Sequence, residues 1–207
     1  MGGDPNPGDR AELERRLQEL QQQLEDYRRR YGELRLAFET LTTIDPISGV
    51  RNRLGILQSV EGALQWNERE GQPFGVAVVH IPGLLEIRAN ESRDLFEEAI
   101  AHVAAVLSAG LRDVDRVGRW SDEVFVIVLA RLDADGVRPV WARLVSMLSA
   151  VPMQGENGTY ELTPKMTALL VPPKSNVTVD EVAQEIDAAM GSEVPDEPRV
   201  VTIFRDA

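Results

Sequence analysis

The chain of 207 residues is 43% apolar and 27% charged, and it contains no cysteine. It is long enough for one domain with a hydrophobic core plus an appended segment, and its composition excludes wholesale disorder, a disulfide scaffold and thiolate metal sites. The net charge of −12 argues against a general nucleic-acid or anionic-membrane binder, because phosphate groups would be repelled overall, but it does not exclude a local basic pocket.

Residues 1–9 are rich in Gly, Pro and Asp, and we interpret them as a flexible leader that lacks the basic and apolar regions of a signal peptide. No apolar run in the sequence approaches the roughly 20 residues that a membrane span requires. We therefore expect a cytoplasmic protein that does not insert into a membrane. With two histidines and no cysteine, we expect no transition-metal site.

Residues 10–42 are predicted to form a coiled-coil helix, because apolar residues recur alternately four and three positions apart. At ~1.5 Å per residue, this segment would form a rod on the order of 50 Å long. The pattern favours a homodimer, and a single helix packed on the globular domain is the alternative. Arg30 and Arg35 would meet as like charges in a parallel dimer, so the helix orientation stays open. The seam consists of Leu13, Leu17, Leu20, Leu24, Tyr27, Tyr31, Leu34, Phe38 and Leu41.

Residues 44–49 end this helix, because they contain a proline, which disfavours α geometry in the residue before it, and then a glycine. Behind them, helices and apolar strands alternate without internal repeats, a pattern typical of an α/β sandwich. A capping box of Thr178 and Glu181 marks the start of the last helix. The expected helices cover 52–68, 96–111, 137–148 and 178–190, and the expected strands cover 75–81, 160–171 and 200–204.

Residues 112–129 are predicted to form a β-hairpin. Residues 112–119 mix polar and apolar side chains, whereas residues 124–129 form a continuous apolar run. A turn of small and acidic residues, 121–123, separates the two strands. The residues of this turn are the main evidence on function in the sequence, and they can be compared with a known family.

The sequence resembles the GGDEF family, the diguanylate cyclases, from residue 45 to about 150 and more weakly to the C-terminus. Residues 45–53, DPISGVRNR, are similar to the opening motif of the family, residues 97–107 match one of its helices, and residues 121–125, SDEVF, fall on its signature turn. The resemblance implies an α/β (α+β) nucleotidyl-cyclase-like sandwich over residues 43–207. Its central, mostly antiparallel sheet would be flanked by helices.

Family members condense two GTP molecules into cyclic di-GMP between two facing domains, with Mg²⁺ neutralising phosphate charge. In this chain, His80 replaces the metal-binding Asp of the first strand, Leu85 replaces a phosphate-contacting Lys, and Arg88 replaces a guanine-reading Asn. Glu97 stands for a second guanine-reading residue, an Asp, which is a mild change. Around residues 193–194 there is no basic residue for the C-terminal Lys of the family.

The signature turn is damaged too. Ser121 and Asp122 stand in place of the two glycines, which let backbone approach the phosphates. Glu123 keeps one metal-binding carboxylate, but Val124 replaces the acidic residue after it. We therefore expect no catalytic residue, no bound metal or cofactor, and no cyclase activity.

A shift of one residue would align Asp122 and Glu123 with the acidic pair of the signature. We reject this shifted register because Arg119, Trp120 and Phe125 match the family only when residues 121–125 are aligned with the signature turn. Neither register restores the double glycine or the first-strand Asp.

Arg112 and Asp115 lie where the family carries an inhibitory R-x-x-D site, and Arg143 on the next helix is placed like an arginine that supports this site. In family members the guanidinium binds guanine and phosphate of the product, and the carboxylate accepts from the guanine edge. The resemblance thus implies that these three residues bind cyclic di-GMP. The alternative is an ordinary surface ion pair at the start of a strand.

Other candidates have simpler interpretations. His80 could be a ligand or a general base, but a single His in an apolar strand is typical of a core or rim residue. Asp122 and Glu123 could hold a weak cation, but such a pair in a turn is usually solvated. The arginine run at 28–30 fits a solvated face of the helix.

Our first hypothesis is a catalytically inactive GGDEF protein that acts as a cyclic di-GMP receptor or signalling adaptor and dimerises through the coiled coil. The second is a nucleotide-independent scaffold that uses the same fold and coiled coil to bind a regulatory protein partner. Residual GTP binding that activates a partner is a third possibility, which Glu97 and Glu123 support and Arg88 opposes.

Overall fold

The computed structural model describes residues 12, 15–30, 42–191 and 196–203 and divides into two compact units, Met1–Leu41 and Thr42–Ala207. In the first unit, residues 15–30 form an α-helix whose side chains are all exposed. Four seam residues of the expected coiled coil lie on it. The exposed fractions are 57% for Leu17, 51% for Leu20, 49% for Leu24 and 67% for Tyr27.

The helix expected over residues 10–42 is therefore confirmed over residues 15–30. The leader at 1–9 and the seam residues Leu13, Tyr31, Leu34, Phe38 and Leu41 lie outside the described residues. Thr42 itself is irregular. No helix in the described part of the chain is both long and apolar enough to cross a membrane.

The second unit is built on a five-stranded sheet in the order β2-β3-β1-β6-β7. The central strand β1 pairs antiparallel with β3 on one side and β6 on the other. The β2–β3 pair is also antiparallel, whereas β7 runs parallel to β6. The sheet is thus mixed and mostly antiparallel, as expected. The strands are β1 (Phe74–His80), β2 (Arg116–Arg119), β3 (Val124–Ala130), β6 (Lys165–Val171) and β7 (Arg199–Thr202).

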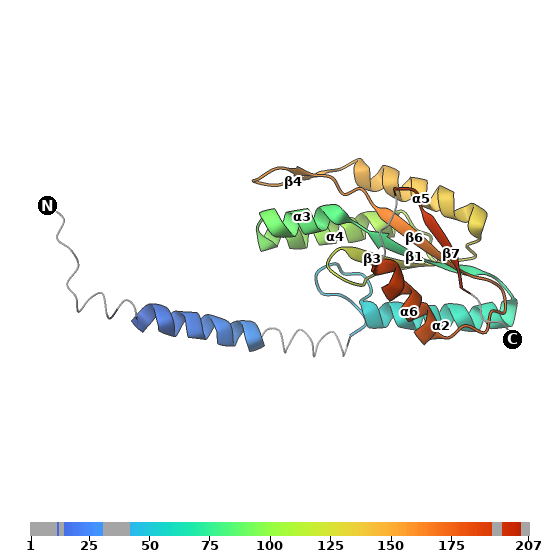
Figure 1. Ribbon diagram of the computed structural model, residues 1–207, viewed down its shortest axis with the longest axis horizontal. Helices are drawn as coiled ribbons and strands as arrows, with labels where there is room; N and C mark the ends of the chain where they lie inside the picture. Colours follow the sequence, from blue (N-terminus) through green and yellow to red (C-terminus); the bar gives the residue numbers. More distant parts are fainter. Residues whose placement is uncertain (1–11, 13–14, 31–41, 192–195, 204–207) are drawn as a thin grey trace. The chain divides into compact units, whose positions relative to one another are not determined.

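Helices cover both faces of this sheet (Figure 1), with α3, α4 and α5 on one face and α2 and α6 on the other. Alternate residues of β1 serve the two faces: Ala77 and Val79 join the α3–α5 side, and Val76 and Val78 join the α2–α6 side. Because both faces of the sheet are buried, the central strands have continuous apolar sequences rather than alternating apolar and polar residues. The helices are α2 (Arg53–Glu70), α3 (Pro82–Asn90), α4 (Arg93–Ala109), α5 (Ala134–Ser149) and α6 (Val179–Met190).

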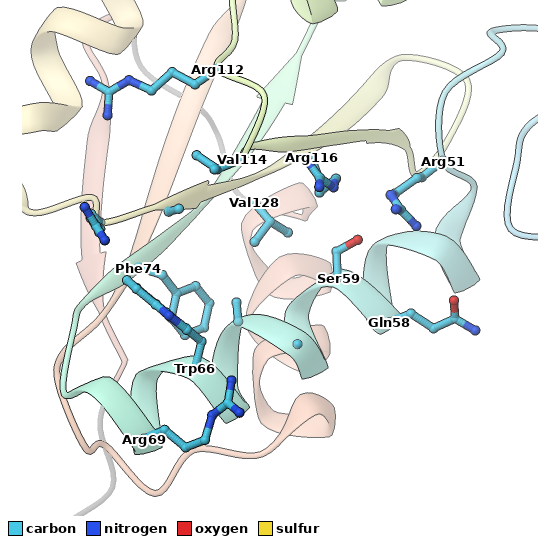
Figure 2. Close-up of a pocket in the computed structure, with 14 residues that line it drawn as sticks. Arg51, Gln58, Ser59, Trp66, Arg69, Phe74, Arg112, Val114, Arg116 and Val128 are labelled. Atoms are coloured by element: carbon cyan, nitrogen blue, oxygen red, sulfur yellow. The ribbon is translucent and has the colours of Figure 1, made fainter.

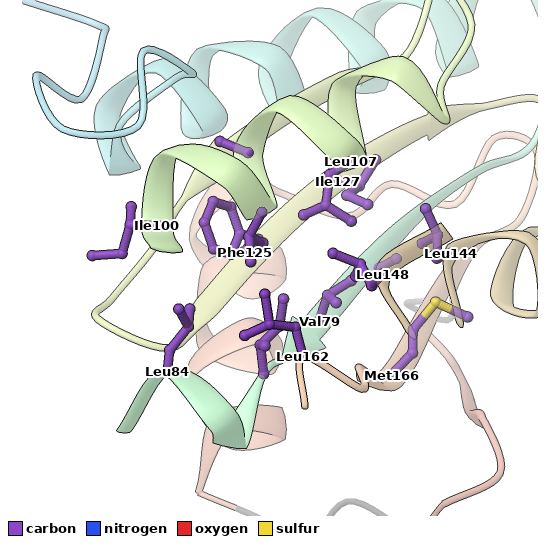
Figure 3. Close-up of a cluster of buried hydrophobic side chains, with 14 of the residues drawn as sticks. Val79, Leu84, Ile100, Leu107, Phe125, Ile127, Leu144, Leu148, Leu162 and Met166 are labelled. Atoms are coloured by element: carbon purple, nitrogen blue, oxygen red, sulfur yellow. The ribbon is translucent and has the colours of Figure 1, made fainter. Parts of the chain in front are cut away.

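The larger core lies between the sheet and the α3–α5 layer (Figure 3). Its side chains come from α4, α5 and the hairpin strand β3, with Phe125 and Ile127 fully buried. Each fully buried side chain of this size contributes about 1.5–3 kcal/mol. The core therefore fixes β3, and with it the turn that precedes this strand.

Side-chain caps fix the starts of two of the expected helices, and the sequence predicted one of them, the capping box of Thr178 and Glu181. At α2, the Asn52 side chain accepts from the Gly55 N–H at 2.9 Å and donates to the Thr42 carbonyl at 2.7 Å. Gly71 ends this helix in the left-handed region, with φ of 62°. At α6, the capping box of Thr178 and Glu181 is complete.

The sequence analysis missed α3 and a short hairpin of β4 (Met153–Gln154) and β5 (Thr159–Tyr160). The strand expected over 75–81 ends at His80, and Pro82 is the first residue of α3. Proline is favoured at this position because the first helical N–H has no partner in any case. The two-residue strands β4 and β5 are too short for a periodic pattern.

Three expected boundaries were wrong. The strand expected from residue 160 begins at Lys165, because residues 161–164 are irregular and include a proline, which cannot donate to a ladder. The first hairpin strand begins at Arg116 rather than at residue 112. The last strand ends at Thr202, and residue 204 lies outside the described residues.

Candidate functional site

The end of β1 meets the β2–β3 turn at one edge of the sheet. His80, the last residue of β1, pairs in register with Val124 on β3 and with Lys165 on β6. The Ile81 N–H donates to the Glu123 carbonyl at 2.9 Å. This pairing brings together His80, Glu123 and Val124, which the sequence analysis placed at the metal site of the family.

His80 lies in surroundings that disfavour its charged form. Its Nε2 atom is buried and has no hydrogen-bond partner in the described chain. Burial lowers the pKa of His80 below its ordinary value of 6.5, and a hydrogen bond with the backbone of Ala189 opposes this only in part. The imidazole is thus neutral at neutral pH and brings no charge to this edge.

The carboxylate beside His80 is disfavoured in the same way. Burial, and then the nearby Asp122 charge, raise the pKa of Glu123 above its ordinary value of 4.5. Val124 is fully apolar and buried. Mg²⁺ needs several hard oxygen ligands, and in the described residues no three His, Asp or Glu side chains come close enough to hold a metal ion. The residues at this edge do not fit the Mg²⁺ that the resemblance implies.

A chain of alternating charges ties the hairpin turn to its neighbours. Buried Arg119 contacts Asp45 with Nη1–Oδ2 of 3.4 Å, and Asp122 with Nη2–Oδ1 of 2.9 Å. Asp122 also accepts from Arg88 on α3. Asp45 is held in turn by Ser48, whose N–H and hydroxyl donate at 2.8 and 2.7 Å. Both oxygens of Asp122 are therefore engaged by arginines.

This network occupies the place where the resemblance puts guanine recognition. Removing one partner from a buried ion pair such as Arg119–Asp45 typically costs about 3–5 kcal/mol, because the other charge is left uncompensated. Arg88 is held across the turn by Asp122. Arg88 therefore connects the turn to α3, whereas the Asn that it replaces in the family would offer its side-chain amide to a guanine base.

The remaining predicted positions are dispersed. Leu85 is 41% exposed on α3. Glu97 accepts from Arg93 Nε at 2.7 Å on its own helix, α4, and has no described contact with Arg88 or Asp122. The Ser121 N–H donates to the Val124 carbonyl at 3.2 Å and so closes the turn.

The R-x-x-D segment is a turn before β2 rather than the start of a strand. Buried Asp115 holds it: Oδ2 accepts from the Arg112 N–H and Oδ1 from the Ala130 N–H, both at 3.1 Å. The Asp115 N–H donates to the Arg112 carbonyl at 3.0 Å. Asp115 thus fixes the backbone of Arg112, whose side chain is exposed. The surface ion pair that we considered as an alternative does not form between these two side chains.

Arg112, Asp115 and Arg143 line one cavity of about 320 Å³ between this turn, the end of β3 and α5. The structure therefore brings together the three residues that sequence analysis selected. The cavity has a further cationic residue, Arg131, in the loop between β3 and α5. Arg131 was missed because nothing in its neighbourhood in the sequence marks it.

A larger cavity of about 810 Å³ lies over α2, and Figure 2 shows the residues around it. Its basic and aromatic side chains come from the segment before α2, from α2, from the start of β1, from residues 112–116 and from the loop after β3. Arg112, Ala130 and Arg131 line both cavities, so the two are neighbours. Sequence analysis missed the other residues that give this cavity its character, which are Arg51, Trp66, Arg69 and Arg116.

The fold and the hairpin define a member of the GGDEF class. The family model for the diguanylate cyclase GGDEF domain matches residues 42–194. The chain belongs to this family.

Among curated proteins, the chain is similar to the diguanylate cyclase DgcP of Pseudomonas aeruginosa, with 24% identity over 119 residues. The aligned stretch covers 58% of this chain but only 18% of DgcP. Among solved structures, it is similar to P. aeruginosa SiaD, a diguanylate cyclase in complex with its activator SiaC. The TM-score is 0.66 and the identity 20%, over 95% of this chain and 75% of that one. The GGDEF domain of Caulobacter crescentus DgcB, solved with c-di-GMP, gives a TM-score of 0.64 at 18% identity, over 77% and 92% of the two chains.

Proposed function

We propose that this protein is a catalytically inactive member of the GGDEF family that works as a cyclic di-GMP receptor or signalling adaptor. The observation that carries this proposal is the cavity lined both by Arg112, in the turn fixed by Asp115, and by Arg143 on α5. Two guanidinium groups on separate elements suit a ligand with two phosphates and planar guanine bases, because the planar fork of arginine matches both.

Asp115 has two roles in this proposal: it fixes the turn, and it offers hydrogen-bond acceptors to the ligand. Each of its carboxylate oxygens already accepts one backbone N–H, but each retains capacity for a second hydrogen bond. The guanine edge can donate to that remaining capacity. Family membership and the c-di-GMP bound to the related DgcB domain support this choice of ligand.

Loss of cyclase activity is the second part of the proposal. His80, Leu85 and Val124 bring no metal ligand or phosphate contact at the expected positions, and Arg88 is engaged with Asp122. Purified protein should form no cyclic di-GMP from GTP with Mg²⁺ or Mn²⁺ in a chromatographic assay. Measurable turnover would overturn this part and leave the receptor role to be judged by binding.

Calorimetric titration with cyclic di-GMP tests the receptor role. We expect saturable binding that weakens about tenfold or more in Arg112→Ala and in Arg143→Ala, since each removes charge-assisted hydrogen bonds worth about 1.5–3 kcal/mol. Arg138→Ala is the matched control, because Arg138 is also exposed on α5 but pairs with Glu197 outside the cavity. No heat at tens of micromolar protein, or binding that ignores Arg112→Ala, would rule the role out.

The competing proposal is a nucleotide-independent scaffold that binds a regulatory protein partner. The exposed apolar seam on helix 15–30 favours it, because such a stripe is available for a partner helix or for a homodimer. The related SiaD was solved with a protein activator, which shows that the fold is compatible with such a partner. A stable protein complex that forms equally well without nucleotide and with Arg112→Ala would favour the scaffold.

A further inference from the structure

The larger cavity, over α2, concentrates positive charge in an acidic protein. Its lining contains five arginines and, in the described residues, no Asp or Glu, whereas the whole chain carries a net charge of −12. Like charges gathered around a hollow repel one another, and a bound anion relieves this repulsion. The arginines are Arg51, Arg69, Arg112, Arg116 and Arg131.

These arginines differ from five others in the same unit, which form ion pairs. Across the described residues, none of the five forms an ion pair with a carboxylate. Arg51 and Arg116 donate only to backbone carbonyls, at 3.5 Å for Arg51 Nη1 to the Gly55 oxygen and 2.8 Å for Arg116 Nη1 to the Asp115 oxygen. Five other arginines of this unit are paired: Arg53 with Asp187, Arg88 with Asp122, Arg93 with Glu97, Arg119 with Asp45, and Arg138 with Glu197. Arg143 and Arg199 also form no ion pair within the described residues, but they lie outside this cavity.

The cavity has two chemically different ends. Figure 2 shows Arg51, Arg116 and Ser59 gathered at one end and Trp66 with Arg69 at the other. Guanidinium and hydroxyl groups at the first end are donors suited to phosphate oxygens. At the second end, Trp66 offers a half-buried ring face, on which a planar base can stack.

Arg131 is held at the aromatic end in an unusual backbone conformation. Its φ is 57°, in the left-handed region, which costs a non-glycine residue about 1–2 kcal/mol. Its guanidinium carbon lies 5.3 Å from the centre of the Trp66 ring, within the range of a cation–π contact. Strained backbone of this kind clusters at ligand sites, and here it sets a cation beside the ring.

We propose that this cavity binds a linear nucleoside polyphosphate, with the phosphates at Arg51, Ser59 and Arg116 and the base on Trp66. A cyclic dinucleotide carries one charge on each of its two phosphates, whereas a nucleoside triphosphate carries roughly three to four negative charges at neutral pH and so matches the five guanidiniums better. The volume of about 810 Å³ lies within the usual range of about 300–1,000 Å³ for small-ligand sites.

This ligand and cyclic di-GMP would oppose each other. Arg112 and Arg131 line both cavities, so two anions would share the same two cations. Coupling between binding sites is reciprocal, and each ligand should therefore weaken the binding of the other by the same factor. The protein would then report the balance between a linear and a cyclic nucleotide.

Calorimetry on the full chain, without divalent metal, tests the proposal with GTP, ATP, GMP and inorganic tripolyphosphate. We expect the nucleoside triphosphates to bind at least tenfold more tightly than GMP. Arg51→Gln with Arg116→Gln should weaken triphosphate binding at least tenfold. Trp66→Leu should weaken GTP and ATP but leave tripolyphosphate unchanged, because only the base contacts the ring.

Two control variants separate this cavity from the other two places where a nucleotide could bind. Arg143→Gln alters only the smaller cavity, and Glu123→Gln alters only the edge beside His80, so both should leave triphosphate binding unchanged. Arg116→Gln, whose side chain is exposed, carries the test if Trp66→Leu does not fold. Failure of cyclic di-GMP binding alone would leave these results standing.

Three results would overturn the proposal. The first is no saturable binding of any triphosphate up to millimolar concentration. The second is binding that responds to Glu123→Gln but not to the Arg51 and Arg116 variants. The third is binding of a glutamate-rich peptide, with no nucleotide binding, that depends on these arginines, which would assign the cavity to an acidic protein segment.

Discussion

His80 and Glu123 are neighbours at the sheet edge, and the pKa of each is displaced toward the neutral form. Burial is the largest cause for both, lowering the pKa of the imidazole and raising that of the carboxyl group. Both shifts disfavour the charged form of the side chain, so burial sets the direction of both titrations at this edge.

The pKa of His80 predicts how stability depends on pH. Because the pKa is lowered in the folded protein, the unfolded chain takes up a proton first as the pH falls below about 6.5. The folded state therefore loses stability from about pH 6.5 downward until the lower pKa of folded His80 is passed. His80→Leu should remove this loss, so that urea unfolding at a series of pH values shows a smaller drop in the free energy of unfolding between about pH 7.5 and 5.5.

A second substitution at the same position provides the control. His80→Gln keeps a polar side chain that cannot take up a proton, and it should remove the drop in the same way as His80→Leu. The raised pKa of Glu123 has the opposite effect, because protonation of this group stabilises the folded state as the pH falls toward 4.5. Glu123 is present in all the variants, so its contribution to the free energy of unfolding cancels in the comparison. An unchanged drop in His80→Leu would contradict the assignment of the titration to His80.

At the scale of elements, periodicity and caps predicted most of the fold. The apolar pattern predicted α2, and the capping box at Thr178 predicted the start of α6. What failed was α3, whose nine residues carry only a small apolar face, and the β4–β5 hairpin. That hairpin is fixed by Glu91, which accepts from the Asn157 N–H at 2.7 Å and the Tyr160 hydroxyl at 2.9 Å, and sequence alone does not show contacts of such long range.

Packing between α2 and β2 depends on a glycine that sequence patterns did not select. A Cβ added at Gly118 would lie 2.3 Å from Ile56 Cγ1 and 2.6 Å from the Arg51 carbonyl oxygen. We expect Gly118→Ala to lower the free energy of unfolding by about 1–3 kcal/mol through overpacking, measured by urea unfolding. Gly62→Ala, in the interior of α2 with nothing within 4 Å of the added Cβ, should instead stabilise by about 0.5–1 kcal/mol. Equal effects of the two substitutions would contradict this reason.

At the scale of the whole molecule, the sequence selected positions that correspond to the family's sites but not the cavities that the fold creates. Arg112, Asp115 and Arg143 could be selected because a family motif fixes their positions. Arg51, Trp66 and Arg131 could not, because they come from three separate segments and only the folded chain brings them to one cavity. The charge composition did not indicate this cavity either, because a net charge of −12 for the whole chain gives no information about a local cluster of arginines.

The first unit of the chain makes a prediction about the assembly. Its helix leaves Leu17, Leu20 and Leu24 about half exposed, and burying a leucine fully in a partner's seam contributes about 1.5–3 kcal/mol. We expect the protein to be a homodimer, with twice the chain mass of 23.0 kDa, in sedimentation and light-scattering measurements. Replacing Leu20 and Leu24 together by Gln should shift it to the monomer mass over a concentration series, because two polar groups would have to be buried in the seam.

The matched control for this variant keeps the seam and changes the opposite face of the same helix. Gln18→Ala with Gln22→Ala lies at outward heptad positions and should retain the dimer. The unfolding of residues 42–207 should be unchanged in the Leu20 and Leu24 variant, because its substitutions lie in the other compact unit. A parent protein that is monomeric, or a seam variant that remains dimeric, would show that self-association does not depend on this stripe, and the exposed leucines would then be available to a different protein.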